Sequence, residues 1–129
     1  MASAVAAAQA VLRAAPQLAG VPISSKAPKP LVRRFIRVTR SGGPRGRHLD
    51  TPRILVECYA STATDTGDGP RAELDAMAAV DALMSAADGG PWAGGWVTGW
   101  DGNNLADYDH PDFPSHSRWQ FTGTLYLLT

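Results

Sequence analysis

The sequence predicts an α+β fold with the element order α-β-β-α-β-β, in which one mostly antiparallel four-stranded sheet carries helices packed on a face. Three observations support this fold class. The 129 residues are enough for one hydrophobic core and too few for two, so residues 1–129 form a single domain. Apolar residues make up 44% and charged residues 19%, as in globular proteins. Apolar positions recur at helical spacing in two segments and alternate in others.

Residues 1–30 are expected to form an N-terminal helix and a proline-bearing arm. The alanine-rich residues 2–15 favour a helix, with Ser3 as its N-cap and Pro16 beyond its end. Its apolar stripe is narrow and small: Val5, Ala8 and Leu12. Residues 21–30 contain three prolines, which lack an N–H and push the preceding residue toward extended geometry. The helix therefore needs a large neighbouring surface to lie on.

A β-hairpin with a long loop is predicted next. Residues 31–39 and 53–60 are its strands, and the Gly-rich residues 41–52 are its loop. Side chains alternate along both strands. One face carries apolar residues: Ile36, Val38, Ile54, Val56, Cys58 and Ala60. The other face carries Phe35, Arg37, Leu55, Glu57 and Tyr59. This alternation indicates that the first face is buried.

Residues 71–87 give the strongest helix signal. Apolar residues recur there at spacings of three and four: Met77, Val80, Leu83, Met84 and Ala87. The acidic residues Glu73, Asp75 and Asp81 are expected mainly off this stripe. Asp68 or Gly69 lies near the N-cap, and the glycines and Pro91 that follow Asp88 end the helix.

Two further strands enclose an acidic segment. Residues 95–100 predict a short strand, and residues 118–128 give the clearest alternation in the chain, with Trp119, Phe121, Leu125 and Leu127 on one face. Residues 101–117 between them form an acidic, proline-containing excursion.

Charge is segregated along the chain although the net charge is zero. Residues 26–53 hold nine of the twelve basic residues and one acidic residue, a net charge of +8. Residues 54–129 hold two basic residues and the other eleven acidic ones, a net charge of −9. This asymmetry suggests a charged partner, either nucleic acid or the acidic half of another copy, although a monomer can also carry such a gradient without a partner.

The polar residues form no recognisable catalytic or metal-binding pattern. His110 and His116 lie among three aspartates, but their spacing matches no zinc site, and no glycine stands where a calcium loop must turn. A surface loop held by its prolines is the favoured interpretation. His48 and Asp50 lie on a loop, whereas Cys58 lies inside a strand as a small buried hydrophobe. We predict no enzyme, no metal and no cofactor.

Neither a secretion signal nor a membrane span is indicated. Residues 1–19 lack a basic n-region, and Gln9 and Arg13 interrupt their apolar stretch. No run approaches the ~20 apolar residues that cross a bilayer. The expected setting is a soluble, reducing compartment such as bacterial cytoplasm.

A small non-specific nucleic-acid-binding protein is one alternative function. The loop around Arg45 and Arg47 is flexible and basic, which suits phosphate contact, but it lacks the Gly-Lys-Ser/Thr ending of a phosphate loop. The zero net charge and the position of the tryptophans in the acidic half argue against a stand-alone DNA binder. Trp96 and Trp100 lie among glycines, an environment that fits either core packing or a protein interface.

Several segments resemble tail terminator proteins of long-tailed (siphovirus-type) phages that infect actinobacteria. The residues that carry the resemblance are the strand 34–40, the Gly-rich basic loop, the strand 52–60, the Ala-rich helix, Pro111-Asp112-Phe113-Pro114 and the final strand 118–127. The likeness runs from about residue 30 to the end. These motifs are strand and loop patterns rather than a chemical signature, and a head-tail connector or stopper of the neck has a similar size.

The resemblance implies a structural virion protein at the head-proximal end of the tail, assembled in the host cytoplasm and without catalytic residues. It implies a homo-hexameric ring that caps the tail tube protein, stops tube growth and joins the head-tail connector or stopper protein. A ring position also allows passive contact with DNA in the channel, and it implies no membrane contact. The alternative is the connector or stopper itself.

The segregated charges suggest how such a ring is built. In a head-to-tail ring, the basic segment of one copy can meet the acidic segment of the next. We expect the hairpin 33–60 to face a neighbour or the channel, and loop 101–117 to meet another subunit or ring. The candidate interface residues are Arg33, Arg37, Arg40, Arg45, Arg47, Asp107, Asp109, Asp112, Trp96 and Trp100.

Overall fold

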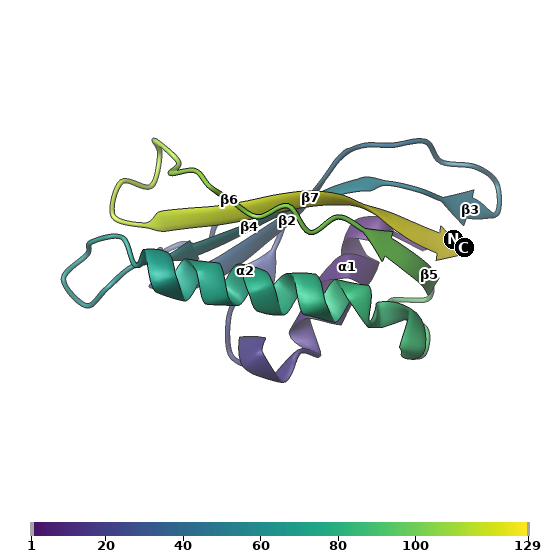
Figure 1. The fold of residues 1–129 in the computed structure, drawn as a ribbon, viewed down its shortest axis with the longest axis horizontal. Coiled ribbons are helices and arrows are strands. Elements are labelled where there is room, and N and C mark those ends of the chain that lie inside the picture. Colours follow the sequence, from purple (N-terminus) through teal and green to yellow (C-terminus); the bar gives the residue numbers. More distant parts are fainter. Residues whose placement is uncertain (1, 129) are drawn as a thin grey trace.

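Two helices lie on one face of a seven-stranded sheet in the computed structural model, which describes residues 2–128 (Figure 1). The order along the chain is α1 (Ala4–Arg13), a short 3-10 helix (Pro16–Leu18), β1 (Ile23–Ser24), β2 (Arg34–Gly42), β3 (Leu49–Asp50), β4 (Arg53–Ala60), α2 (Gly69–Met84), a second 3-10 helix (Ala86–Asp88), β5 (Trp96–Asp101), β6 (Ala106–Asp107) and β7 (Ser117–Leu128). The α+β class is as predicted.

Strand β7 pairs with most of the other strands of the sheet, namely β3, β4, β5 and β6. The predicted hairpin forms as β2 and β4, which pair antiparallel, and β4 pairs antiparallel with β7. Strand β3 continues along the same side of β7 as β4. Strands β5 and β6 pair with the opposite side of β7, because Thr124 is opposite both Arg53 of β4 and Asp101 of β5. The outer strand at the other edge is β1, which runs parallel to β2.

The prediction of four strands was wrong, and the reason is strand length. The three extra strands, β1, β3 and β6, have two residues each, which is too short to produce a readable alternation. They lie in the segments assigned to the arm, to the hairpin loop and to the acidic excursion. The parallel pair β1–β2 also makes the sheet mixed.

Helix α1 forms where alanine propensity predicted it. The Oγ of Ser3 accepts a hydrogen bond from the backbone N–H of Ala6 at 3.2 Å and caps the helix. The buried face consists almost entirely of small side chains: Ala4, Ala7, Ala8, Val11 and Leu12. The helix packs against β2 and α2, so the large surface that its thin stripe requires is the sheet itself.

Helix α2 starts at the predicted cap but buries a different face. Asp68 accepts a hydrogen bond from the backbone N–H of Arg71 at 3.1 Å. Val80 and Leu83 are buried as expected, whereas Met77 and Met84 are exposed. Half of the six buried positions are alanines, namely Ala72, Ala76 and Ala79. These small residues let the helix approach the sheet closely, so the larger methionines point to solvent.

A carboxylate on the buried face of α2 contradicts the expected placement of the acidic residues. Asp75 is buried, and Arg34 of β2 donates to both of its oxygens, at 3.0 and 2.8 Å. Arg71 donates to Asp75 Oδ1 at 3.0 Å. Two arginines compensate the charge, which is the condition under which a carboxylate can be buried. The ion pair between Arg34 and Asp75 also links β2 to α2.

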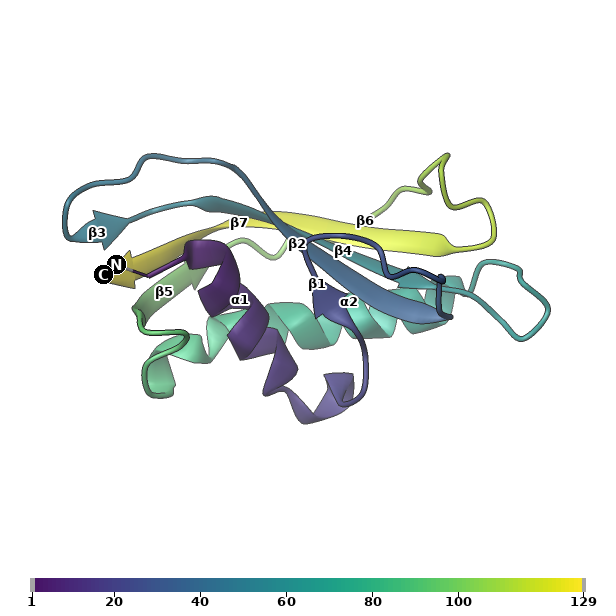
Figure 2. The same cartoon turned by 180° about the vertical axis from the view of Figure 1, so that it is seen from behind.

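The two faces of the sheet differ in what covers them. The apolar side chains of β2, β4 and β7 point toward the helices and form the core with α1 and α2. Figure 2 shows no helix on the opposite face. Residues 108–116, the loop between β6 and β7, fold over part of that face, where Phe113 meets Phe35 and Tyr59. No helix within residues 2–128 is both long and apolar enough to cross a membrane.

The molecule is elongated, with different loops at its two ends (Figures 1 and 2). The β2–β3 loop lies at one end, beside the last residues of β7, because Leu49 is opposite Leu128. The loop 61–68 and the loop 108–116 lie at the other end, where β7 begins. Strand β7 has twelve residues, which at ~3.4 Å per residue separates these ends by roughly 35–40 Å.

Candidate subunit interface

Two of the candidate arginines are held inside the monomer. Arg37 donates to both carboxylate oxygens of Glu57, at 3.0 and 3.2 Å. Arg40 donates to Asp50 Oδ2 at 3.0 Å and to the carbonyl oxygen of Gly43. Both carboxylates are buried, so these arginines neutralise charges of their own chain. Part of the positive charge of residues 26–53 is therefore neutralised by carboxylates of the same chain.

The other three candidate arginines are exposed but do not lie together. Arg33 is beside the loop 61–68, since its carbonyl accepts from the N–H of Ser61 at 2.8 Å. Arg45 and Arg47 lie on residues 43–48, which we call the basic loop, at the opposite end. None of the three forms an ion pair with the residues that the structure describes. Arg45 and Arg47 are thus free to meet a partner.

The candidate aspartates are also exposed. Asp107, Asp109 and Asp112 lie on residues 107–112, which we call the acidic loop: it begins with the last residue of β6 and continues toward β7. Tyr108 within it is 65% exposed, and the guanidinium of Arg118 lies 5.5 Å from its ring centre. The acidic loop and the basic loop occupy opposite ends of the molecule (Figure 1). Surfaces of opposite charge at opposite ends can complement each other when copies associate head to tail.

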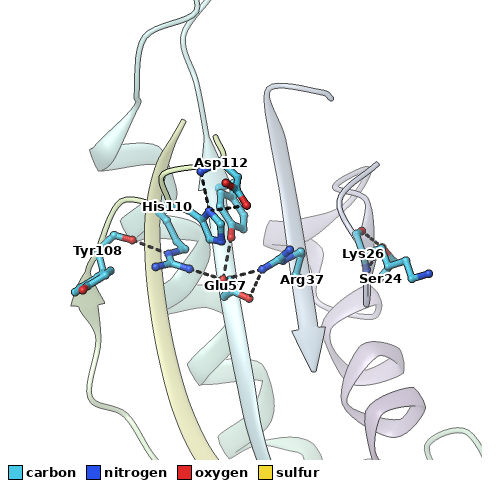
Figure 3. Close-up of polar contacts among 9 residues, drawn as sticks. Ser24, Lys26, Arg37, Glu57, Tyr108, His110 and Asp112 are labelled. Atoms are coloured by element: carbon cyan, nitrogen blue, oxygen red, sulfur yellow. Dashed lines mark hydrogen bonds and ion pairs between the residues drawn. The ribbon is translucent and has the colours of Figure 1, made fainter. Parts of the chain in front are cut away.

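A buried ionic cluster holds the acidic end of the open sheet face together (Figure 3). Its centre is Glu57, which accepts from Arg118 at 2.6 Å, from the Tyr59 hydroxyl at 2.8 Å and from Arg37 at 3.0 Å. Burial alone would raise the pKa of Glu57, but the hydrogen bonds from Tyr59 and Arg118 and the charge of Arg37 outweigh it and lower that pKa. Burial, together with the bond to Glu57, raises the pKa of Tyr59 to about 12.

Aromatic contacts and one histidine fix the loop 108–116. The Phe113 ring meets Tyr59 edge-on at 5.1 Å, and Tyr59 stacks on Phe35 at 4.5 Å. The Nε2 atom of His116 lies 2.8 Å from the carbonyl oxygen of Val32, which joins the loop to the end of the arm. Arg118 donates to the carbonyl of Tyr108. The position of the acidic loop is therefore defined by the sheet beneath it.

The two candidate tryptophans have different roles. Trp100 packs edge-on against Phe121 of the core and donates through Nε1 to the carbonyl of Gly102, so it anchors β5. Trp96 is 54% exposed, on the sheet face away from the helices. The β-bulge between Val97 and Gly99 accounts for the difference, because it shifts the alternation of β5 by one residue.

Trp96 belongs to an exposed apolar patch that sequence reasoning missed. Leu128 of β7 is opposite Leu49 of β3 on one side and Trp96 of β5 on the other, and directly opposed residues point to the same face. Tyr126, two residues before Leu128, shares that face. We call these four residues, Leu49, Trp96, Tyr126 and Leu128, the apolar patch. Large exposed apolar patches mark interaction sites in soluble proteins.

The residues considered for catalysis are not brought together. Asp50 is opposite Leu127 of β7 and Cys58 is opposite Trp119, eight positions apart along the strand, roughly 27 Å. Burial, followed by the charges of Asp75 and Glu57, raises the pKa of the Cys58 thiol well above its ordinary value, so the thiolate is not available near neutral pH. Residues 2–128 hold no group of three His, Cys, Asp or Glu side chains that could ligate a metal ion.

Comparison with known proteins gives a match of fold. No family profile matches the sequence, and no curated protein sequence matches it. The fold is similar to that of a chain in the solved structure described as "Virion of native gene transfer agent (GTA) particle", with a TM-score of 0.71 and 16% sequence identity. The superposition covers 98% of this chain and 96% of that chain. The two chains therefore share one fold over almost their entire lengths.

Proposed function

We propose that this chain is a structural virion protein, the tail terminator that forms a ring on the tail tube, stops its growth and offers the surface for joining the head. The observation that carries the proposal is the end-to-end match of fold with a chain of a gene transfer agent virion. The superposition covers 96% of that chain and 98% of this one, so the likeness extends over the whole fold. The sequence resemblance to tail terminators points to the same class.

The distribution of charge supports assembly of several copies. Arg45 and Arg47 are exposed at one end, and Asp107, Asp109 and Asp112 at the other. A contact between unlike surfaces of identical chains generates a ring when the rotation closes, and a hexamer is the closure that the resemblance implies. The elongated shape keeps the two ends apart within one copy, so their charges are satisfied by neighbours.

The proposal includes two partners besides the chain itself. One rim of the ring binds the last ring of the tail tube protein, and the other rim binds the head-tail connector or stopper protein. DNA passes through the channel with passive contact only. The protein therefore reaches the virion tail at its head-proximal end after assembly in the host cytoplasm.

A tube-growth assay tests the proposal and separates it from the connector alternative. Purified tail tube protein is allowed to polymerise with and without this chain, and tube lengths are measured by negative-stain electron microscopy. A terminator arrests growth, so the tubes become shorter as its concentration rises. A connector leaves the length distribution unchanged. Salt-sensitive binding of the monomeric chain to DNA, with no effect on tubes, would instead favour the nucleic-acid-binding alternative.

A further inference from the structure

We infer that the apolar patch is the seat for the acidic loop of a second copy of this chain. The inference rests on the proposed ring and deepens it, since it names the two surfaces that meet. The patch is assembled from three strands that are distant in sequence, and its four side chains are 36–54% exposed. The loop 108–116 covers the other end of this sheet face, and the four residues of the patch remain open to solvent.

The patch has a positively charged rim. The basic loop, with Arg45 and Arg47, leads directly into Leu49. Arg53 also borders the patch, but Asp101 lies across Thr124 from it on the same row of the sheet and offsets its charge. Arg45 is opposite Asp50 and lies with it toward the start of α1, on the helix side of the sheet. The uncompensated charge nearest the patch is therefore that of Arg47, two residues before Leu49. An apolar centre with an arginine rim is the usual anatomy of a protein interface.

The acidic loop has the complementary composition. Tyr108 provides an exposed aromatic ring, and Asp107, Asp109 and Asp112 surround it with negative charge. The backbone of this loop is preorganised, because Arg118 and Phe113 tie it to the sheet. A loop that is already ordered loses little conformational entropy on binding. Opposite charges also select this partner over others and speed the encounter.

A second exposed apolar surface fits the acidic loop less well. Leu74, Met77 and Met84 form a stripe on the outer face of α2, but the charged neighbours there are Glu73 and Asp81. These carboxylates would repel the aspartates of the loop. The stripe is as exposed as the patch, since Leu74 is 51% and Trp96 54% exposed. It therefore supplies a matched control position.

Cross-linking can detect the contact even when it is transient. Cysteines are introduced at His48→Cys in the basic loop and Ala106→Cys beside the acidic loop, which leaves every Arg and Asp of both surfaces in place. Within one chain the two sites are roughly 27 Å apart, as counted along β7, so a short bismaleimide can join them only between copies. We expect a ladder of dimers and higher multimers. A monomer band alone would overturn the inference.

Point variants then test the patch itself. Trp96→Glu in the two-cysteine background should lower the cross-linked yield on the order of tenfold, as expected for a central aromatic residue of an interface. Leu74→Glu on α2 should leave the yield unchanged. Equal yields from Trp96→Glu and the parent would overturn the inference. Circular dichroism of both variants checks that these exposed substitutions leave the fold intact.

Charge exchange identifies the partner surface. Arg45→Glu/Arg47→Glu and Asp107→Lys/Asp112→Lys should each lose the ladder alone, because both ends of each variant then carry the same sign. Mixing the two variants should restore it, since each altered end now meets an oppositely charged one. Failure of the mixture to restore cross-links would show that the acidic loop is not the occupant. Tube arrest by the wild-type chain is scored separately, and its absence would overturn the proposed function instead.

Discussion

Replacing Glu57 with glutamine removes the charge at the centre of the ionic cluster while keeping the shape of the side chain. Glu57 is buried, and it accepts hydrogen bonds from Arg118, Tyr59 and Arg37. In the Glu57→Gln variant the guanidinium of Arg118, with a side chain 10% exposed, keeps a buried charge without its counter-ion. The side chain of Arg37 is 24% exposed, so water can solvate its charge and the energetic cost there is smaller.

The expected loss follows from this difference in exposure. Removing one partner of a buried ion pair costs about 3–5 kcal/mol. Because Arg37 can rehydrate, we expect the lower end, about 3 kcal/mol. In a domain of this size such a change lowers the melting temperature by roughly 10 °C. Small domains have unfolding free energies of only about 5–15 kcal/mol in total, so the effect is readily measured.

The loss of unfolding free energy in Glu57→Gln should become smaller as the pH falls. The pKa of Glu57 in the folded state lies below its ordinary value of 4.5, so in acid the unfolded state binds the extra proton. The stabilisation by Glu57 is therefore complete above about pH 4.5 and is lost as the pH falls through the folded-state pKa. The gap in unfolding free energy between wild type and Glu57→Gln should narrow over that range.

Urea denaturation followed by circular dichroism, at pH 7 and in steps below pH 5, measures both effects. Asp81→Asn is the control, because Asp81 is an exposed carboxylate on α2 without an ion pair among residues 2–128. It should change the unfolding free energy by less than about 0.5 kcal/mol. A Glu57→Gln variant that unfolds within about 1 kcal/mol of wild type at pH 7 would refute this account of the cluster.

Three further predictions concern packing. In Gly123→Ala the new methyl group would overlap the indole of Trp100, so we expect a loss of about 1–3 kcal/mol in urea titrations; unchanged stability would mean that the indole moves aside freely. Phe113→Ala removes the edge-on contact with Tyr59 and should speed hydrogen exchange across residues 108–116 while the rest of the sheet keeps its protection. Cys58 is buried with a raised pKa, so thiol reagents at pH 8 should modify the native protein on the order of a hundredfold more slowly than the urea-unfolded chain.

The faces of the main strands could be predicted from sequence because each face has a distinct chemistry. In β4 every second residue is apolar and packs against the helices, while Glu57 and Tyr59 point to the open face. Helix α2 could not be oriented in this way. Its two exposed methionines are more hydrophobic than the buried alanines, but the short distance between helix and sheet favours small side chains and the Asp75–Arg34 pair. Tertiary packing decided the orientation there.

The candidate interface could be predicted only in part. The charge of each segment can be counted from the sequence. This count singled out Arg45, Arg47 and the aspartates of the acidic loop as charged surface residues. The pairing of Arg37 with Glu57 depends on the register of the hairpin, which the long loop left undetermined. The apolar patch depends on three strands that meet at Leu128. No pattern within one segment reveals such a meeting.

Counting bound copies per tail tube tests whether this chain caps the ends of the tube. Tubes of different lengths are co-sedimented with this chain, and bound protein is quantified against the number of tube ends. A terminator ring should give a constant number, about six copies per capped end for the hexamer that the resemblance implies, independent of tube length. Binding that grows in proportion to tube length, or no binding at all, would show that the chain is not a tube cap.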